Sequence, residues 1–246
     1  MSGTLYLLPS PISTGPLEAA LPADVIGVAR RVHHFLVEDA KTARAFLKRL
    51  GHPTPLRDLS IVEIGHTPVD AEIAQWLAPL ETGADIAVVS EAGCPAIADP
   101  GATLVAAAHR SGWKVQPLVG PSSILLALMG SGLNGQRFRF VGYVPIAAEE
   151  RAQTIRALEH QSKSGETQIL IETPYRNTAL FDALLQHCAP TTRLSLAVDL
   201  TGNGESIAQR TVGEWLSQPP DARPLLAKRP VIFCLLAQAG LSSGSA

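Results

Sequence analysis

Short apolar runs alternate with helical patterns through the first half of the chain. The runs that predict strands are Gly3 to Leu8, Phe35 to Val37, Leu59 to Ile64, Ile86 to Val89 and Val115 to Val119. Between them, Lys41 to Leu50 has the period of an amphipathic helix that ends at Gly51. A second helix is predicted by the helical spacing of Val69, Ile73, Trp76, Leu77 and Leu80. Because several strand runs are apolar at every position, the alternation predicts a mostly parallel α/β sheet.

The second half repeats the alternation of strands and helices. A helix is predicted from Gly120-Pro121-Ser122 through Met129. Further strands are expected at Phe138 to Val144, Gln168 to Ile171, Leu194 to Val198 and Val231 to Leu236, with helices at Glu149 to Gln161 and Thr178 to Cys188. Because Pro and Gly mark a break at Gln116 to Pro121, we expect two α/β domains, residues 1–117 and 118–240, and a tail at 241–246.

Composition and charge exclude several classes of protein. The 246 residues are 46% hydrophobic and 17% charged, which is far from the composition of disordered chains. A formal net charge of -2 argues against a generally basic nucleic-acid-binding protein, although local basic faces remain open. The longest apolar run, Ile124 to Met129, is too short to span a bilayer, and Met1 to Leu5 has no basic signal region. We therefore expect a cytoplasmic protein.

The cysteines and histidines do not have the spacing of metal sites. Cys94, Cys188 and Cys234 stand far apart, which predicts buried, reduced thiols. The seven histidines also lack metal-ligand spacing, so no metal is expected.

A literal G-x-G-x-x-G occurs at Gly130 to Gly135. The dinucleotide-binding motif follows a strand and begins a helix, whereas this copy follows a predicted helix and precedes a strand. It therefore predicts a helix end and a turn.

Three strand-to-helix connections have the residues of ligand-binding loops. Pro9-Ser10-Pro11 follows the first strand, Ser90 to Pro100 follows the fourth, and Gly120 to Ser123 precedes a helix. Small residues let the backbone approach a ligand, and Asp99-Pro100 is expected to provide the N-cap and first residue of the next helix. In a parallel sheet such loops gather beyond the carboxyl ends of the strands, where ligands bind.

Four motifs in order carry a family resemblance. They are Gly3 to Leu7 with Pro11-Ile12, Val89 to Pro95 with Asp99-Pro100-Gly101, Gly120 to Ser123, and Glu172-Thr173-Pro174-Tyr175-Arg176. Together they resemble the tetrapyrrole methylase superfamily. Within it, the chain is similar to the branch of small-subunit ribosomal RNA methyltransferase I, which methylates a ribose 2'-hydroxyl. The similarity extends from Gly3 to about Leu236.

The resemblance implies two α/β domains with S-adenosylmethionine bound in the cleft between them, and a homodimer. The implied cofactor-binding residues of the first half are Pro9, Ser10, Pro11, Ser90, Glu91, Ala92, Gly93, Cys94, Ile97, Ala98, Ser122 and Ser123. Those of the second half are Thr173, Pro174, Tyr175, Ala197, Asp199, Thr201, Pro230 and Val231.

Departures from the branch keep other acceptors open. Ser13-Thr14-Gly15 stands where the branch has Gly-Asn-Leu, and Cys94 replaces a threonine. Tyr175 replaces a histidine, and Ala40-Lys41 stands where Thr-Arg is expected. The main hypothesis is a methyltransferase acting on RNA. The alternatives are a methyltransferase for a tetrapyrrole or another small molecule, and a catalytically silent cofactor-binding regulator.

Three carboxylates are candidate catalytic residues. Methyl transfer depends on alignment, and a ribose acceptor must also lose a proton. Glu38, Glu172 and Asp199 are each predicted at the carboxyl end of a strand. Helix capping, hydrogen bonding to the cofactor or an ion pair are alternative roles for each of them.

Two further segments have two interpretations each. One predicted helix carries four positive charges, on Lys41, Arg44, Lys48 and Arg49. Such a concentration of charge is typical of a solvated helix face or of an edge that contacts phosphates. Gly202 to Glu205 is either a mobile substrate gate or a hairpin turn.

Overall fold

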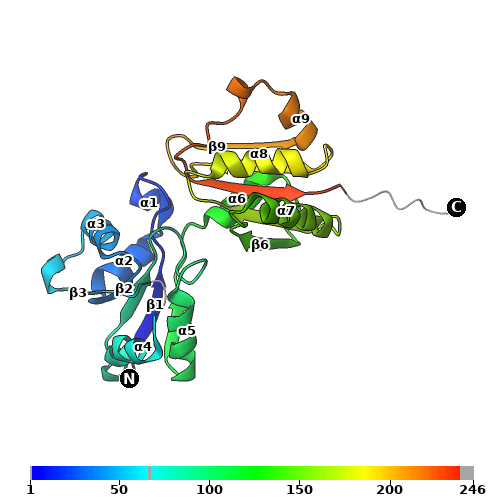
Figure 1. Ribbon diagram of the computed structural model, residues 1–246. Coiled ribbons are helices and arrows are strands. Elements are labelled where there is room, and N and C mark those ends of the chain that lie inside the picture. The colour runs from blue at the N-terminus through cyan, green and yellow to red at the C-terminus, as the bar shows by residue number, and fades with distance from the viewer. Residues whose placement is uncertain (1, 66–67, 239–246) are drawn as a thin grey trace. The chain divides into compact units, whose positions relative to one another are not determined.

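The computed structural model describes residues 2–65 and 68–238 and divides the chain into two units, Met1–Ser122 and Ser123–Ala246. Each unit has its own five-stranded sheet with helices packed on it (Figure 1). The prediction of two α/β domains is confirmed. The contacts keep residues 118–122 with the N-terminal unit, whereas the sequence suggested a boundary at 117. The predicted tail, 241–246, lies outside the described residues.

The N-terminal unit contains a fully parallel sheet with the strand order β3-β2-β4-β1-β5. Its strands are β1 (Thr4–Leu8), β2 (His34–Val37), β3 (Ser60–Glu63), β4 (Ile86–Val89) and β5 (Lys114–Pro117). Its helices are α1 (Leu17–Ala20), α2 (Ala23–Arg31), α3 (Ala40–Leu50), α4 (Asp70–Leu77) and α5 (Gly101–Arg110), with single 3₁₀ turns η1 (Leu56–Asp58) and η2 (Ala78–Thr82). The predicted strands are all present, whereas α1 and α2 were not predicted.

Alternation along the central strands explains the two cores of this unit. Leu5 and Val88 point to the face covered by α4 and α5, where they pack with Leu104. Tyr6 and Val89 point to the other face, where α1, α2 and α3 cover them. Because helices cover both faces, β4 is apolar at every position, and β1 and β2 are apolar after their first residues, Thr4 and His34.

The C-terminal unit has a mixed sheet with the order β6-β7-β10-β8-β9. Its strands are β6 (Phe138–Gly142), β7 (Thr167–Ile171), β8 (Arg193–Val198), β9 (Ser206–Thr211) and β10 (Val231–Leu236). β6 and β7 are parallel, and the other neighbours are antiparallel. Its helices are α6 (Ser123–Ser131), α7 (Ala148–Ser162), α8 (Asn177–His187) and α9 (Val212–Ser217), with the 3₁₀ turn η3 (Pro220–Ala222). β9 and α9 were not predicted.

A buried aromatic pair anchors the core on one face of this sheet. Trp215 of α9 is 1% exposed and donates its indole N–H to the carbonyl of Leu194 at 3.0 Å. Its ring meets Phe181 of α8 edge to face, with the centroids 5.5 Å apart. Helix α6 packs instead on β8, β9 and β10, on the face that carries Ile207. Both faces of the sheet are therefore covered.

The glycine-rich segment after α6 is a helix end, as predicted. Gly132 follows α6 with a φ of +66°, the left-handed conformation that commonly ends helices. The hydroxyl of Ser131 accepts a hydrogen bond from the N–H of Leu133 at 3.0 Å. The segment thus forms a turn. Within residues 2–65 and 68–238, no helix has the length and apolar composition needed to cross a membrane.

All three cysteines are free thiols, and two of them are buried. Burial raises the pKa of both Cys188 and Cys234 to about 12, and for Cys188 the charge of Glu159 adds to this effect. These thiols remain protonated in the folded protein at pH values at which an unfolded thiol ionises.

This difference predicts an alkaline loss of stability that Cys234→Ala removes in part. The ordinary thiol pKa is 9.0, so between pH 9 and 12 the unfolded state releases a proton that the folded state keeps. The wild type should lose about 1.4 kcal/mol per pH unit more than the variant across this window. Urea unfolding at a series of pH values measures it. Below pH 8 the difference between the two proteins should be constant, and parallel curves up to pH 11 would refute the prediction.

Candidate functional site

Loops from distant parts of the chain meet at the carboxyl edge of the N-terminal sheet. After β1, the N–H of Ser10 donates to the carbonyl of Gly93 at 3.0 Å, and the N–H of Gly93 donates to the carbonyl of Ser10 at 3.1 Å. The hydroxyl of Ser10 donates to the carbonyl of Ser90, and that of Ser90 to the carbonyl of Gly93. The β1 and β4 loops are therefore joined by an isolated antiparallel bridge beyond their parallel strands.

The turn after β5 closes on the same two loops. The thiol of Cys94 donates to the carbonyl of Pro121 at 3.3 Å. A Cβ at Gly120 would lie 2.3 Å from ring carbons of Pro9, so this position requires glycine. Ser122, a predicted cofactor residue, follows this turn, and Ser123 begins α6 across the unit boundary.

The loop after β4 has an unusual backbone. Gly93, Ala96 and Ala98 have φ values of +80°, +67° and +61°. The left-handed conformation is unfavourable for alanine, and such strain concentrates at functional sites. It persists only where neighbouring groups hold it.

Asp99 holds this loop. Its Oδ1 accepts hydrogen bonds from the N–H groups of Ala96 and Gly101, both at 2.8 Å. Its Oδ2 is buried without a hydrogen-bond partner. The sequence predicted Asp99 as N-cap and Pro100 as the first helical residue. That prediction was wrong by one residue, because α5 begins at Gly101 and its N-cap is Pro100. The Asp99 carboxylate, which precedes the N-cap, accepts the N–H of the first helical residue, Gly101.

Burial raises the pKa of Asp99, the hydrogen bonds from Gly101 and Ala96 oppose this rise, and the charge of Glu38 adds to it. Glu38 follows β2, and its Oε2 accepts from the N–H of Glu91 at 3.1 Å. Three acidic side chains thus lie along this edge: Glu38, Glu91 and Asp99.

The predicted cofactor residues of the N-terminal unit divide into two groups. Ser10 and Ser90 are 3% and 8% exposed, and their hydroxyls bind loop carbonyls, so these serines fix the loops. Pro9 and Gly93 are buried, whereas Pro11 and Cys94 are half-buried. The exposed members are Glu91, Ala92, Ile97 and Ala98. A ligand at this edge would meet the small side chains of Ala92 and Ala98 and the larger ones of Glu91 and Ile97.

In the C-terminal unit, the predicted residues gather where β10 begins. Val231 pairs with Val198, and Ile232 pairs with Ala197 and Ile171. The N–H of Asp199 donates to the carbonyl of Pro230 at 2.9 Å, and the N–H of Lys228 to that of Pro174 at 3.0 Å. The end of β7, the end of β8 and the start of β10 therefore lie side by side.

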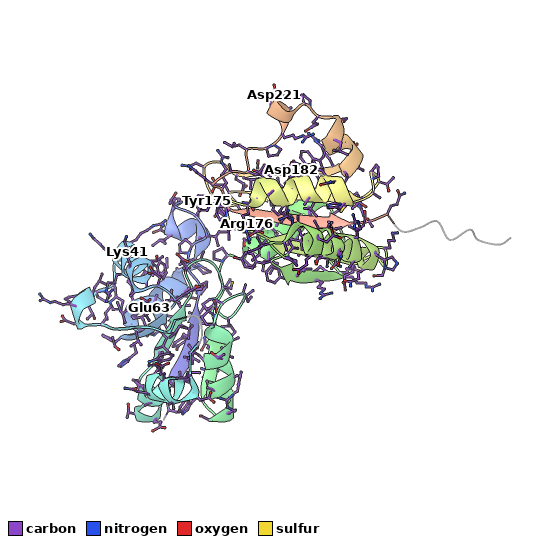
Figure 2. The ribbon with its side chains drawn as sticks, in the orientation of Figure 1. Lys41, Glu63, Tyr175, Arg176, Asp182 and Asp221 are labelled. Carbon is purple, nitrogen blue, oxygen red and sulfur yellow. The ribbon has the colours of Figure 1, made fainter. Side chains whose placement is uncertain are left out.

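Glu172 fixes the turn after β7. It is 8% exposed, and its Oε1 accepts from the N–H of Thr173 at 2.6 Å. The same oxygen accepts from Nε of Arg176 at 3.1 Å and from Nη2 at 2.6 Å. This ion pair lies at the start of α8, where Arg176 is the N-cap. Tyr175, the residue before Arg176, is 83% exposed (Figure 2).

Asp199 has the corresponding position after β8. Its φ is +50°, and its Oδ2 accepts from the N–H of Gly204 at 2.9 Å. Thr201, with a φ of +63°, donates its N–H to Oε2 of Glu205. β8 and β9 pair antiparallel on either side, so Gly202 to Glu205 is a hairpin connection.

The structure thus groups the predicted site residues into one cluster in each unit. The sequence missed the pairing of Glu172 with Arg176 and the bond from Glu91 to Glu38. The spacing of Glu172 and Arg176, four positions apart at a helix start, was the available signal for the first pairing. The structure shows no group of three His, Cys, Asp or Glu side chains arranged as metal ligands in the part of the chain it describes.

Comparisons with known proteins agree on one family. The family model described as Tetrapyrrole (Corrin/Porphyrin) Methylases matches residues 12–215. Ribosomal RNA small subunit methyltransferase I of Micromonospora olivasterospora is 35% identical over 179 residues, or 73% of this chain and 54% of the relative. The protein of that name from Neisseria meningitidis serogroup B is 31% identical over 214 residues, or 87% of this chain and 69% of the relative. The chain thus spans about half to two thirds of these relatives.

A solved structure shares the fold. Uroporphyrin-III-C-methyltransferase from Thermus thermophilus superposes with a TM-score of 0.53 at 21% identity, covering 98% of this chain and 95% of that one. The chain is therefore similar to this structure in its fold as well as to the relatives in its sequence.

Two substitutions at Asp99 should have opposite effects on stability. Asp99→Ala removes the acceptor of two N–H groups and should lower the free energy of unfolding by about 2 kcal/mol. Asp99→Asn keeps an acceptor oxygen and removes the buried charge, so at pH 7 it should be at least as stable as the wild type.

The pH dependence distinguishes the charge from the hydrogen bonds. Because the folded pKa of Asp99 lies above its ordinary value of 3.8, the unfolded state ionises first, and the wild type loses stability as pH rises from 3.8 through the folded pKa. The advantage of Asp99→Asn should therefore shrink as pH falls toward 3.8 in denaturant titrations. An Asn variant as unstable as the Ala variant at pH 7 would contradict this account.

Proposed function

Because this chain belongs to the tetrapyrrole methylase family, we propose that it is an S-adenosylmethionine-dependent methyltransferase that methylates ribosomal RNA at a ribose 2'-hydroxyl. The observation that carries the proposal is the set of ordered loops at the two clusters, found in a chain close to the small-subunit ribosomal RNA methyltransferase I branch. The relatives' names point to ribosomal RNA of the small subunit as the acceptor, and the ribose 2'-hydroxyl is what the family resemblance implies. We also propose that the protein works in the cytoplasm.

The residues present fit a ligand that approaches the loop backbone closely and carries a hydrogen-bond donor. The strained positions Gly93, Ala96 and Ala98 have small side chains or none, and the buried Oδ2 of Asp99 has no partner among the described residues. When bound, the cofactor supplies an electrophilic methyl group. The N-terminal residues proposed to hold it are Pro9, Ser10, Pro11, Ser90, Glu91, Ala92, Gly93, Cys94, Ile97, Ala98, Ser122 and Ser123. The C-terminal ones are Thr173, Pro174, Tyr175, Ala197, Asp199, Thr201, Pro230 and Val231.

A ribose hydroxyl must lose its proton as its oxygen bonds to the methyl carbon, so a proton acceptor is needed near it, and a carboxylate can take this role. Glu38 and Asp199 are half-buried at strand ends; Glu38 accepts the N–H of Glu91 from the β4 loop, and Asp199 accepts the N–H of Gly204 within its own hairpin connection. We assign them as candidate proton acceptors. Glu172 is committed to Arg176 through one oxygen, which supports a positioning role for this third candidate.

The first test is transfer of labelled methyl groups to purified small ribosomal subunits, to the RNA extracted from them, and to small-molecule extracts. Labelled RNA is expected. Label in small molecules alone would support a tetrapyrrole or other small acceptor. Binding of the demethylated cofactor without any transfer would support a regulatory module, and failure to bind it would overturn the family-based proposal.

A glycine pair tests the cofactor loop. Gly93→Val places a branched side chain at a φ of +80°, with Ile12 and the carbonyl of Pro121 both 3.4 Å from the new Cβ. Because the loop must move, affinity for the demethylated cofactor should fall about tenfold or more, the equivalent of about 1.4 kcal/mol. Calorimetric titration measures this change.

Gly112→Val is the matched control. Gly112 has a φ of +71° with nothing within 4 Å of the added Cβ, and it lies in the turn before β5, away from the loops. It carries similar backbone strain but should bind the cofactor normally. Equal losses in both variants would show that strain, and not the loop, caused the effect.

We further propose that two copies form a homodimer, supported by an apolar patch on the C-terminal unit. Met129 of α6 is 78% exposed, and Ile207 of β9 is 38% exposed. Ile207 lies against Gly130, the residue after Met129 in α6: a Cβ at Gly130 would lie 2.4 Å from the Ile207 side chain. Exposed apolar patches of this kind are typical of protein contacts.

Met129→Glu should therefore shift the protein toward a monomer in sedimentation velocity experiments, because a charge would be buried at the contact. Leu225→Glu is the control, since Leu225 is 66% exposed on a different segment of the same unit. A wild type that sediments as a monomer would refute the homodimer, and a Met129→Glu dimer would refute this patch as its contact.

A further inference from the structure

Helix α3 carries a row of positive charge that the site described above does not use. Its buried residues, Ala43, Phe46, Leu47 and Leu50, face the core. Lys41, Arg44 and Lys48 are all exposed and recur at helical spacing on the opposite side, and Figure 2 shows Lys41 at the start of the helix. We name these three residues the α3 basic stripe.

Lys41 has an acidic neighbour in Asp39, whose pKa is lowered mainly by its hydrogen bonds from Thr42 and to a smaller extent by the Lys41 charge, but the stripe forms no close ion pair among the described residues. Helix α3 has no acidic residue. In residues 2–65 and 68–238, none of the three forms an ion pair within 4.0 Å, and Arg44 reaches only the carbonyl of Ala40 at 3.5 Å. Nearby basic residues differ, because Arg49 donates to the carbonyl of Gly15 and Arg57 faces Asp58 at 3.7 Å. The stripe is therefore available to an anion from outside the chain.

The carboxylates at the start of α3 are already engaged. Oδ1 of Asp39 accepts from the N–H of Thr42 at 2.6 Å as the N-cap of the helix. Oε2 of Glu63 accepts from the N–H of Ala40 at 3.1 Å. These two acids thus fix the helix start, while the lysine and arginine heads extend from the face beyond it.

The stripe starts at the candidate cofactor edge. Lys41 follows Glu38 by three positions, and Glu38 binds the N–H of Glu91 in the β4 loop. From Lys41 to Lys48 the helix rises by about 10 Å. A polyanion along this face would thus lead to the edge of the sheet where the loops meet.

We propose that the α3 basic stripe binds the phosphate backbone of the RNA acceptor and guides it to the carboxyl edge of the N-terminal sheet. This inference rests on the proposed methylation of RNA. The chain as a whole has a net charge of -2, so the concentration of positive charge on one helix face sets this surface apart from the average surface. RNA is favoured because phosphates are the anions that rows of Lys and Arg bind.

The test compares RNA binding by the full chain and by Arg44→Gln/Lys48→Gln as salt is varied. Losing two phosphate contacts should make the slope of log affinity against log salt shallower by about 1.4, and weaken binding about 20-fold at 0.1 M salt. Affinity for the demethylated cofactor should stay unchanged. Methylation assays should show a raised KM for RNA with kcat nearly constant.

The matched control is Arg110→Gln/Lys114→Gln. These exposed residues lie at the end of α5 and the start of β5. β5 is the outer strand on the side of the sheet away from β2 and β3, which α3 connects, so this variant should bind RNA as the wild type does. A second variant, Arg44→Lys/Lys48→Arg, keeps the charges and should also retain binding, which separates charge from loss of structure.

The outcomes separate the two proposals. If the wild type methylates RNA but the stripe variant and the control behave alike, the stripe is not the RNA surface. If the wild type binds no RNA and transfers no methyl group to it, the proposed function fails and the stripe inference falls with it. Binding of an acidic protein or anionic vesicles to the stripe in place of RNA would also overturn the inference.

Discussion

The parallel hydrogen bonding of β1 between β4 and β5 determines where the loops of the N-terminal unit can lie. Parallel strands end at the same edge, so the segments after them must meet there. Past the strands, Ser10 and Gly93 exchange backbone bonds in an isolated antiparallel bridge that joins the two loops, and Gly120 fits against Pro9 because it has no side chain. The strained backbone from Gly93 to Ala98 is held by this frame and by Asp99.

Carboxylates connect these loops in both units. Glu38, Glu172 and Asp199 each follow a strand and accept a backbone N–H: Glu38 from Glu91 in the β4 loop, and Glu172 and Asp199 from Thr173 and Gly204 in their own loops. A buried N–H needs an acceptor, and a short acidic side chain at a strand end can reach one. The same groups that suit proton transfer therefore also shape the site. Substitutions at these positions will change geometry as well as chemistry, which is why matched controls matter.

The sequence predicts elements whose burial leaves a periodic signal. The four-residue β4 is apolar at every position and was located by its pattern. β9 has the sequence Ser-Ile-Ala-Gln-Arg-Thr at a sheet edge, and this polar composition hides it. The four loop segments were found through motifs, but the bond from Glu91 to Glu38 joins residues 53 positions apart. Such a contact depends on the strand order β2-β4, which no local pattern encodes.

The central position of β10 in the C-terminal sheet constrains the order in which this unit can fold. β10 pairs with both β7 and β8, yet it follows them, β9 and α9 in the chain. During synthesis, β7 and β8 therefore emerge from the ribosome with no strand between them. The N-terminal sheet is complete once β5 at Lys114–Pro117 has been made, so it can form early. The C-terminal unit must wait for Leu236, and until then its unpaired strand edges are open to chaperones and to mispairing.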